Sequence, residues 1–386
     1  MKRKTKHIKI IRTSTVPTSL ETFLKGFLKK LSTSYEVVAV SSPGEPLEII
    51  HKREGIRTVE VPMERHISIF KDVMSLLRLI IVFYKEQPTI VHSITPKAGL
   101  LSMLAAWITR VPIRIHTFTG LVFPTSTGIK RSILMFMDKL TCGCATYINP
   151  ESKGVAKDLK QFGITSKELH IIANGNVRGI DMEYYQRTDE VMRQSQLLKL
   201  NQGTTFCFVG RIVGDKGINE LVRAFDKLTQ TYKDVNLLLV GSFENQLDPL
   251  SEATNEILHN NQHISCLGEQ PDVRPYLAAS DIFVFPSYRE GMPNVVLEAG
   301  AMGLPCIVTD INGSNEIIIE GENGEIIPVR DEEALFEKMR DWVAHPEKVR
   351  GMAQNARRMI AERYEQQLIW NSLLDVYNNL SKGLNC

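Results

Sequence analysis

Hydrophobic residues in the first half of the chain form short strand-like runs separated by longer helix-like runs. The strand-like runs are rich in β-branched residues and lie at residues 7–12, 35–42, 89–94 and 113–118. The spacing predicts helices over about 20–31 and over 97–108 between them. Strands that alternate with helices of this length predict a parallel sheet with helices on both faces.

The same alternation begins again after a polar stretch without strong periodicity. New strand-like runs start with TTFCFVGR and continue through VNLLLVGS, HISCLG, DIFVFPS and PCIVTD. We therefore predict an α/β protein of two Rossmann-like domains that face each other across a ligand cleft at the carboxyl ends of their strands. The predicted parts are a first domain at 1–178, a linker at 179–203, a second domain at 204–365 and a closing helix at 366–386.

Length and charge support two domains with different partners. A chain of 386 residues exceeds the usual size of one core. The net charge is only +2, yet residues 1–180 hold 27 Lys and Arg against 13 Asp and Glu, whereas residues 181–386 hold 19 against 31. This asymmetry predicts an anionic partner for the first half.

Cysteine usage and the amino-terminal segment predict a cytoplasmic protein. The six cysteines have no spacing typical of a zinc site, and a chain of this size does not need disulfides. The basic start, MKRKTKHIKIIR, alternates like a strand and is not followed by the long apolar core of a signal peptide. Segments 67–86 and 128–140 mix basic and bulky apolar residues, which is typical of helices that lie on a membrane surface, but charges interrupt both and both are too short to span. Helices that pack on the sheet would have the same pattern.

The first candidate for chemistry is the segment FVGRIVGDKGINEL. It reads as a strand, a glycine-rich loop with Arg211 and Lys216, and the start of a helix. Two cations at such a helix start suit a diphosphate, because each can neutralise a separate oxygen. Two solvated loop cations remain an equally good interpretation of this segment alone.

The second candidate is REGMPNVVLEAGAMGLPCIVTDINGSNEII, residues 289–318. Glu290 is predicted in a strand-to-helix loop, and Glu298 on a buried helix over about 295–302. The first turn of that helix presents backbone N–H groups that attract phosphate. The two carboxylates, with these N–H groups between them, suit a ligand that carries sugar hydroxyls at one end and ribose hydroxyls at the other.

These segments, together with ENGEIIPVRD, resemble the signature regions of family 4 retaining glycosyltransferases, which have the GT-B fold. VHSITPKAGLLSMLAAWITRVPIRIHTFTGL and IIANGNVRGID in the first half are similar to bacterial transferases that build capsule, O-antigen and other lipid-linked glycans. The resemblance covers essentially the whole chain. One departure lies at residues 13–20, where TSTVPTSL replaces the Gly-Gly loop that many members carry.

Carried over residue by residue, the resemblance implies a donor site in the second domain. Arg211 and Lys216 would bind the donor diphosphate, Glu290 the donor sugar and Glu298 the ribose. The backbone around Asn294, Val295 and Val296 would face the phosphate, and His116 takes the position of the family's active-site histidine. His92, in VHSITPKAG, is an open case between a catalytic and a structural role.

The resemblance also implies the reaction. A hexose or N-acetylhexosamine would move from a nucleotide sugar, UDP-linked rather than GDP-linked, to a hydroxyl of a lipid-diphosphate-linked glycan, with the anomeric configuration retained. We expect no cofactor and no metal, because the two cations replace one, and no nucleic-acid partner. The basic first half would hold the enzyme on the anionic inner face of the cell membrane.

Two other functions fit parts of the pattern. A UDP-sugar 2-epimerase has a similar fold, but the spacing of the two glutamates and GRIVGDKG argue against it. A non-catalytic subunit that binds nucleotide or glycan would not need the full set of Arg211, Lys216, Glu290 and His116.

Overall fold

The computed structural model describes residues 8–64, 66, 68–198, 200, 202–244 and 248–383. The chain divides into two compact units, unit 1 with residues 1–179 and 367–386 and unit 2 with residues 180–366. Residues 179–203, the predicted linker, include helix α8 (Asp189–Gln196), whose Val191 is buried in the core of unit 2. The predicted closing helix is α16 (Gln366–Lys382), which belongs to unit 1 from residue 367 onward.

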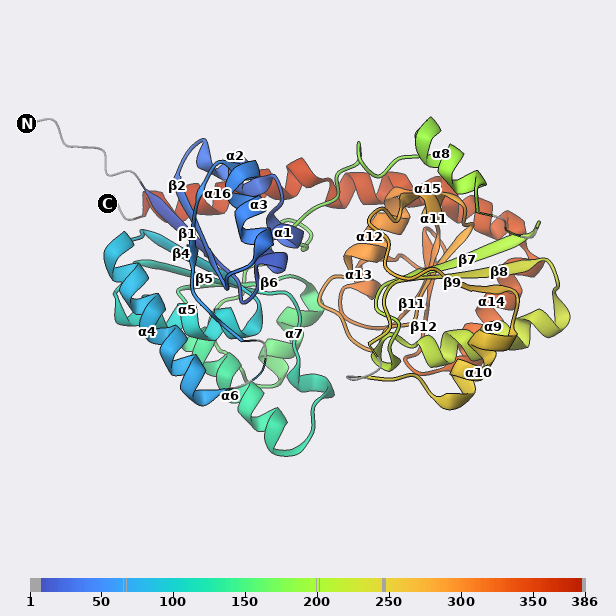
Figure 1. Ribbon diagram of the computed structural model, residues 1–386, viewed down its shortest axis with the longest axis horizontal. Coiled ribbons are helices and arrows are strands. Elements are labelled where there is room, and N and C mark those ends of the chain that lie inside the picture. Colours follow the sequence, from blue (N-terminus) through green and yellow to red (C-terminus); the bar gives the residue numbers. More distant parts are fainter. Residues whose placement is uncertain are drawn as a thin grey trace, which may run out of the picture. The chain divides into compact units, whose positions relative to one another are not determined.

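The described part of unit 1 contains a six-stranded parallel sheet with the order β3-β2-β1-β4-β5-β6 (Figure 1). Its strands are β1 (Lys9–Thr13), β2 (Glu36–Ser41), β3 (Arg57–Glu60), β4 (Ile90–Ile94), β5 (Ile113–Phe118) and β6 (Tyr147–Pro150). Its helices, besides α16, are α1 (Pro17–Leu24), α2 (Phe27–Ser32), α3 (Glu45–Glu54), α4 (Ile69–Glu86), α5 (Pro96–Ile108), the 3-10 helix η1 (Phe123–Thr125), α6 (Gly128–Cys144) and α7 (Lys153–Gln161).

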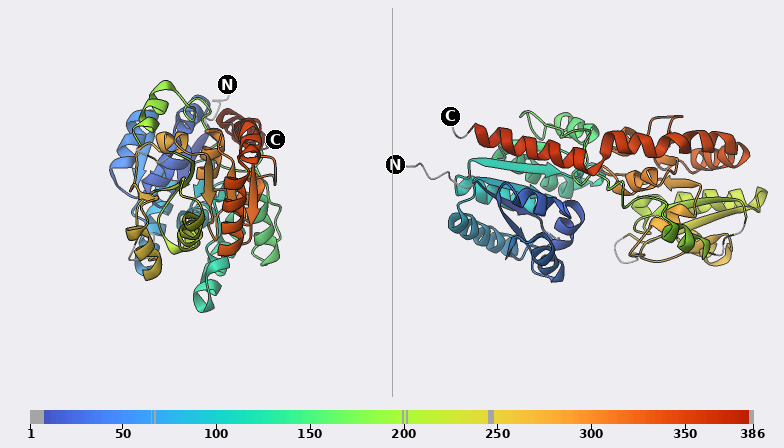
Figure 2. Two further views of the ribbon diagram at one scale, coloured as in Figure 1. Left: turned by 90° about the vertical axis from the view of Figure 1, so that its right-hand side faces the viewer. Right: turned by 90° about the horizontal axis from the view of Figure 1, so that it is seen from above.

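Helices cover both faces of this sheet because neighbouring strand residues point to opposite sides. Ile10 packs with α1, α2, α3 and α16, whereas Ile11 packs with α4, α5, α6 and α7. Figure 2 shows α16, in red, running alongside the sheet, and Trp370 and Tyr377 on this helix are buried there. The chain's last helix thus completes a hydrophobic core that begins with its first strand.

The single helix predicted over 20–31 is wrong, because α1 and α2 are separate helices. The chain breaks between them at Gly26, which has φ 79°. A Cβ atom at this position would lie 2.9 Å from the Trp370 ring. Glycine accepts both the left-handed backbone and this close approach, so α16 packs tightly against the break.

The described part of unit 2 also contains a six-stranded parallel sheet, with the order β12-β11-β10-β7-β8-β9. Its strands are β7 (Thr204–Val209), β8 (Val235–Val240), β9 (Ile264–Cys266), β10 (Ile282–Phe285), β11 (Cys306–Thr309) and β12 (Gly324–Ile327). Its helices, besides α8, are the 3-10 helix η2 (Gly214–Lys216), α9 (Ile218–Thr231), α10 (Glu252–Asn260), α11 (Arg274–Ala278), α12 (Asn294–Ala301), α13 (Ser314–Ile317), α14 (Glu332–Ala344) and α15 (Pro346–Tyr364).

Each sheet has the strand order of a Rossmann fold, which confirms the predicted fold class. In both sheets the order reverses beside the first strand of the unit, between β1 and β4 in unit 1 and between β7 and β10 in unit 2. Ligands of open α/β sheets bind beyond the carboxyl ends of the strands at such switch points. The loops after β1, β4, β7 and β10 are therefore where a site is expected.

Candidate active site

The loop between β7 and α9 carries both predicted phosphate-binding cations. Arg211 lies two residues after the end of β7, and Lys216 ends the 3-10 helix η2. The next residue, Gly217, has φ 71°, and a Cβ atom there would lie 2.1 Å from the carbonyl oxygen of Pro286. Only glycine fits both conditions, so this loop packs directly on the segment that follows β10.

This close packing brings Lys216 together with Glu290. The Lys216 Nζ forms an ion pair with the Glu290 carboxylate, and both side chains are largely buried, with 15% and 18% of their surface exposed. The Ser287 hydroxyl donates a second hydrogen bond to the same carboxylate oxygen at 3.0 Å. The Phe285 ring centroid lies 5.6 Å from the Lys216 Nζ. The glutamate at the second switch-point loop is thus oriented by a cation from the first.

Arg211 is paired with a different carboxylate. Its Nη1 donates to Glu244 Oε2 at 2.7 Å, beyond the carboxyl end of β8, and the two side chains are 45% and 32% exposed. An ion pair with this much solvent contact contributes little to stability, so it can exchange partners easily. Both cations that the sequence singles out therefore lie at the carboxyl edge of the sheet, each beside a carboxylate.

Helix α12 begins close to Glu290, at Asn294. Pro293 is its N-cap residue and makes no side-chain cap hydrogen bond to the first turn. Asn294 and Val295 are half-buried in that turn, and Val296 is fully buried. Glu298, one turn further on, is 7% exposed. The predicted donor-site residues thus lie along one loop and the start of one helix. They are Glu290, Asn294, Val295, Val296 and Glu298.

His116 lies inside unit 1. It is on β5, two residues before the end of the strand, and is 1% exposed. Its Nδ1 lies 2.8 Å from the Ser93 hydroxyl, and a Cβ atom at Gly99 of α5 would come within 2.3 Å of its ring. Burial lowers its pKa to about 3, so the ring is neutral at physiological pH. Its predicted role as the active-site histidine stays a prediction.

His92 belongs to a buried polar network between the unit 1 sheet and α16. Its Nδ1 lies 2.6 Å from the Tyr377 hydroxyl, and its Nε2 lies 2.7 Å from the Thr117 hydroxyl. Arg12, which is 1% exposed, donates to the same Tyr377 hydroxyl at 2.5 Å. Burial, together with the nearby Arg12 and His116, lowers the pKa of His92 well below its usual value. These contacts indicate a structural role in holding α16 on the sheet.

The structure adds partners that sequence reasoning missed. Ser287 and Glu244 hold Glu290 and Arg211, yet neither stands out by spacing, because serine and glutamate are common in loops. Their place directly after β10 and beyond β8 is the only signal that could have found them. In the described part of the chain, no three His, Cys, Asp or Glu residues lie together as metal ligands would, and metal independence stays a prediction.

Comparison with known proteins identifies the family. Residues 190–359 match the model for glycosyl transferases group 1, and residues 28–175 match the model for a glycosyl transferase 4-like domain. The capsular polysaccharide biosynthesis glycosyltransferase CapM of Staphylococcus aureus is 34% identical over 366 residues, which cover 92% of each chain. This chain belongs to the group 1 glycosyltransferases. The family 4 resemblance is confirmed, and no finding favours the epimerase alternative.

A second relative of this glycosyltransferase is also named as a sugar transferase, and a solved structure shares its fold. A UDP-Gal:α-D-GlcNAc-diphosphoundecaprenol α-1,3-galactosyltransferase of Escherichia coli is 29% identical over 294 residues, 72% of each chain. The crystal structure of HepE from Anabaena in complex with UDP and glucose has a TM-score of 0.81 at 16% identity, and the match covers 97% of this chain and all of that one. This structural likeness confirms the GT-B fold.

Proposed function

We propose that this glycosyltransferase moves a hexose or N-acetylhexosamine from a UDP-sugar to a hydroxyl of a lipid-diphosphate-linked glycan in bacterial surface polysaccharide synthesis. The observation that carries the proposal is the meeting of Lys216 and Glu290 at the unit 2 switch point, with Arg211 at the same edge. The E. coli relative is named for a diphosphoundecaprenol-linked acceptor and a UDP-linked donor. HepE, which shares the fold, was crystallised with UDP.

In this proposal unit 2 holds the donor. Arg211 and Lys216 bind the diphosphate, and the backbone N–H groups around Asn294, Val295 and Val296 add to the positive field there. Glu290 accepts hydrogen bonds from the donor sugar, and Glu298 from the ribose. Lys216 must then share Glu290 with the sugar, and Arg211 must exchange Glu244 for phosphate oxygens. Phosphate is the stronger competitor because Arg211 can bind it in a bidentate manner.

The reaction proceeds on one face of the sugar. The bond between the anomeric carbon and the UDP oxygen breaks as the acceptor hydroxyl approaches from the same side, and the leaving phosphate oxygen takes the hydroxyl proton. The products are UDP and a glycoside with the configuration of the donor. Arg211, Lys216 and the α12 N-terminus stabilise the charge that grows on the leaving group, which is usually the largest catalytic term. These groups do the work for which other transferases use a metal ion.

The reaction is tested by incubating the pure protein with a panel of UDP-sugars and a membrane lipid fraction. The proposal requires that label from one UDP-sugar appears in the lipid-extractable product together with free UDP. Interconversion of the donor without transfer would instead indicate an epimerase. Binding of UDP without either reaction would indicate a non-catalytic subunit.

The membrane partner is also part of the proposal. No helix in the described ranges is long and apolar enough to cross a bilayer. Helix α4, however, exposes an apolar stripe along its length, and α6 exposes a second one. The stripe residues are Ile69, Phe70, Val73, Met74, Leu77, Ile81 and Tyr84 on α4, and Ile129, Ile133 and Phe136 on α6. Basic residues flank both stripes, so an anionic lipid surface complements them in both hydrophobicity and charge.

Sedimentation with vesicles tests this contact. Phe70, 79% exposed, and Ile81, 53% exposed, are replaced together by serine in one variant. The matched control is Ile319→Ser, because Ile319 is an exposed apolar residue of unit 2. The double variant should lose most binding to vesicles with anionic lipid, whereas the control should bind as the wild type does. Equal binding of all three proteins would refute the proposed membrane surface.

A further inference from the structure

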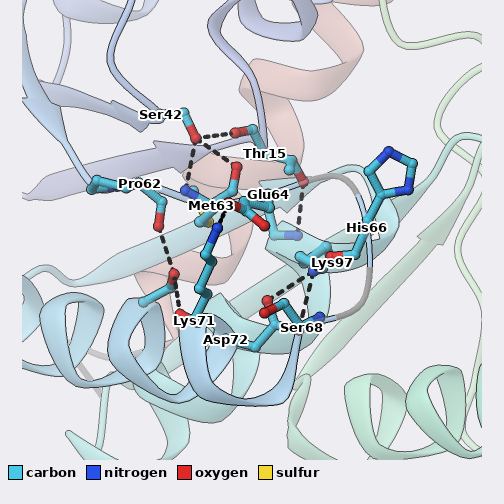
Figure 3. Close-up of polar contacts among 12 residues, drawn as sticks. Thr15, Ser42, Pro62, Met63, Glu64, His66, Ser68, Lys71, Asp72 and Lys97 are labelled. Atoms are coloured by element: carbon cyan, nitrogen blue, oxygen red, sulfur yellow. Dashed lines mark hydrogen bonds and ion pairs between the residues drawn. The ribbon is translucent and has the colours of Figure 1, made fainter.

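A largely buried ion pair joins α4 to the start of α5 in unit 1 (Figure 3). The Lys97 Nζ lies 2.8 Å from Asp72 Oδ1 and 3.1 Å from Asp72 Oδ2, and it also donates to the backbone carbonyl of His66. The two side chains are only 7% and 19% exposed. Breaking such a pair by removing one partner leaves a buried charge without its partner, which is strongly unfavourable. The pair therefore fixes the geometry of the segments that carry it.

On one side, the pair is anchored at the switch point of the unit 1 sheet. Lys97 is the second residue of α5, which follows β4. Thr15, after β1, bonds to the Thr95 hydroxyl at 2.8 Å and accepts from the Ala98 N–H at 3.1 Å. Figure 3 shows that Ser42 extends this network, because its hydroxyl donates to the Thr15 carbonyl at 2.8 Å. The loops beyond β1, β2 and β4 are thus tied together beside Lys97.

On the other side, the pair holds the first turn of α4. Asp72 Oδ2 accepts from the Ser68 N–H at 3.1 Å, which caps the helix start. Ile69 and Phe70, the most exposed apolar residues of the α4 stripe, are in the same turn. One buried side-chain pair therefore connects the end of the apolar stripe directly to the carboxyl edge of the sheet.

We propose that Lys97 and Asp72 are positioning residues for the lipid-linked acceptor. The inference rests on the proposed function. An acceptor whose lipid end lies in the membrane beside α4 and whose hydroxyl must reach the carboxyl edge of the sheet needs a fixed relation between these two parts. Small displacements of a reacting group reduce transfer strongly, because catalysis depends on orientation. Lys97, whose Nζ contacts Asp72 and the His66 carbonyl, supplies that fixed relation.

The chain offers a matched control away from the proposed membrane surface. Lys52 is an exposed lysine of α3, which packs on the face of the sheet opposite α4 and α5. Substitutions of such exposed residues usually have little energetic effect. Lys52→Met therefore removes a lysine of the same unit without disturbing the connection between α4 and α5.

The test compares Michaelis constants for the lipid-linked acceptor in vesicles and for the UDP-sugar. Lys97→Met should raise the Michaelis constant for the acceptor about tenfold, within the range found for mutations in coupled networks. It should change the Michaelis constant for the donor less than about twofold. Asp72→Asn should act in the same direction, and Lys97→Arg should keep the Michaelis constant for the acceptor near the wild-type value. Lys52→Met should match the wild type. Thermal unfolding and vesicle sedimentation verify folding and membrane contact for each variant.

The outcomes separate this inference from the function on which it rests. Failure of the wild type to transfer sugar to lipid would reject the proposed function. Wild-type transfer with an unchanged acceptor constant in folded Lys97→Met or Asp72→Asn would reject only the positioning role. Equal increases in donor and acceptor constants would also reject it, because the effect would then be general. If Lys97→Met does not fold, the isosteric Asp72→Asn decides the question.

Discussion

At the scale of single residues, the two cations of the unit 2 switch point determine the proposed chemistry. Arg211 and Lys216 each contact a carboxylate, and in the proposed mechanism each neutralises a separate phosphate oxygen. Replacing either by alanine should lower the turnover number about a hundredfold or more, the cost of removing one oxyanion-type donor. The matched control is Lys227→Ala, because Lys227 pairs with Glu333 on the surface of the same unit. Steady-state kinetics on the folded variants measure the effect. Wild-type turnover in a folded variant that lacks both cations would remove them from the mechanism.

Replacing each of the two glutamates of this region should change a different kinetic constant. Glu298 is assigned to the ribose, which does not change during the reaction, so Glu298→Gln should mainly raise the Michaelis constant for the donor. Glu290 is assigned to the reacting sugar, so Glu290→Gln should mainly lower the turnover number. The comparison needs only purified variants, a UDP-sugar series and the acceptor. The reverse pattern would place the donor in the opposite direction along this loop and helix.

At the scale of elements, two histidines buried against α5 and α16 link the stability of unit 1 to pH. The pKa of His116 is lowered to about 3, and that of His92 is well below its usual value, both mainly by burial. The unfolded chain therefore binds more protons at these two histidines below about pH 6.5, so their contribution to stability is fully present above that pH and decreases as the pH falls. His116 should remove about 1.4 kcal/mol of unfolding free energy between pH 7.5 and 5.5, and His92 should act in the same direction.

Urea unfolding at the two pH values measures this loss. His116→Asn should reduce the difference in unfolding free energy between pH 7.5 and 5.5 by about 1.4 kcal/mol. This holds even when the substitution also changes the stability measured at each single pH. An unchanged difference would show that this ring is not buried and neutral in the folded protein.

The elements also show what a sequence can and cannot predict. Buried runs such as residues 204–209 and 235–240 are almost continuously apolar, so their strands follow directly from the pattern. The edge strands β3, β6 and β12 have only four residues each, with polar positions among them, and the pattern does not distinguish them from loops. The break at Gly26 depends on Trp370, which is more than 300 residues away. Local patterns carry no information about such a contact.

The candidate site also has one part that the sequence pattern predicts and one part that it does not. Arg211, Lys216 and Glu290 could be selected because a glycine-rich loop and a helix start restrict the chemistry. That Lys216 contacts Glu290 could not be derived from the pattern, because 74 positions separate them and the contact depends on Gly217 packing against Pro286. The burial of His116 was equally hidden, since it depends on Gly99 of the neighbouring helix.

At the scale of the whole molecule, one topology is used twice with opposite charge. Both units have the Rossmann strand order, yet residues 1–180 carry an excess of basic residues and residues 181–386 an excess of acidic ones. A basic unit suits an anionic lipid-diphosphate and an anionic membrane. In the acidic unit, the two cations at the sheet edge are the proposed diphosphate site. The charge distribution thus supports the proposal that the acceptor binds unit 1 and the donor binds unit 2.

The proposed reaction is metal-free transfer from a UDP-sugar with retention of the anomeric configuration. The most direct measurement is the anomeric configuration of the new glycosidic bond, determined by NMR on product made from an α-linked UDP-sugar in the presence of EDTA. We expect an α-linked product, formed at nearly the rate found without the chelator, because in the proposed mechanism Arg211 and Lys216 stabilise the leaving group. A β-linked product, or no product until magnesium or manganese is added, would contradict it.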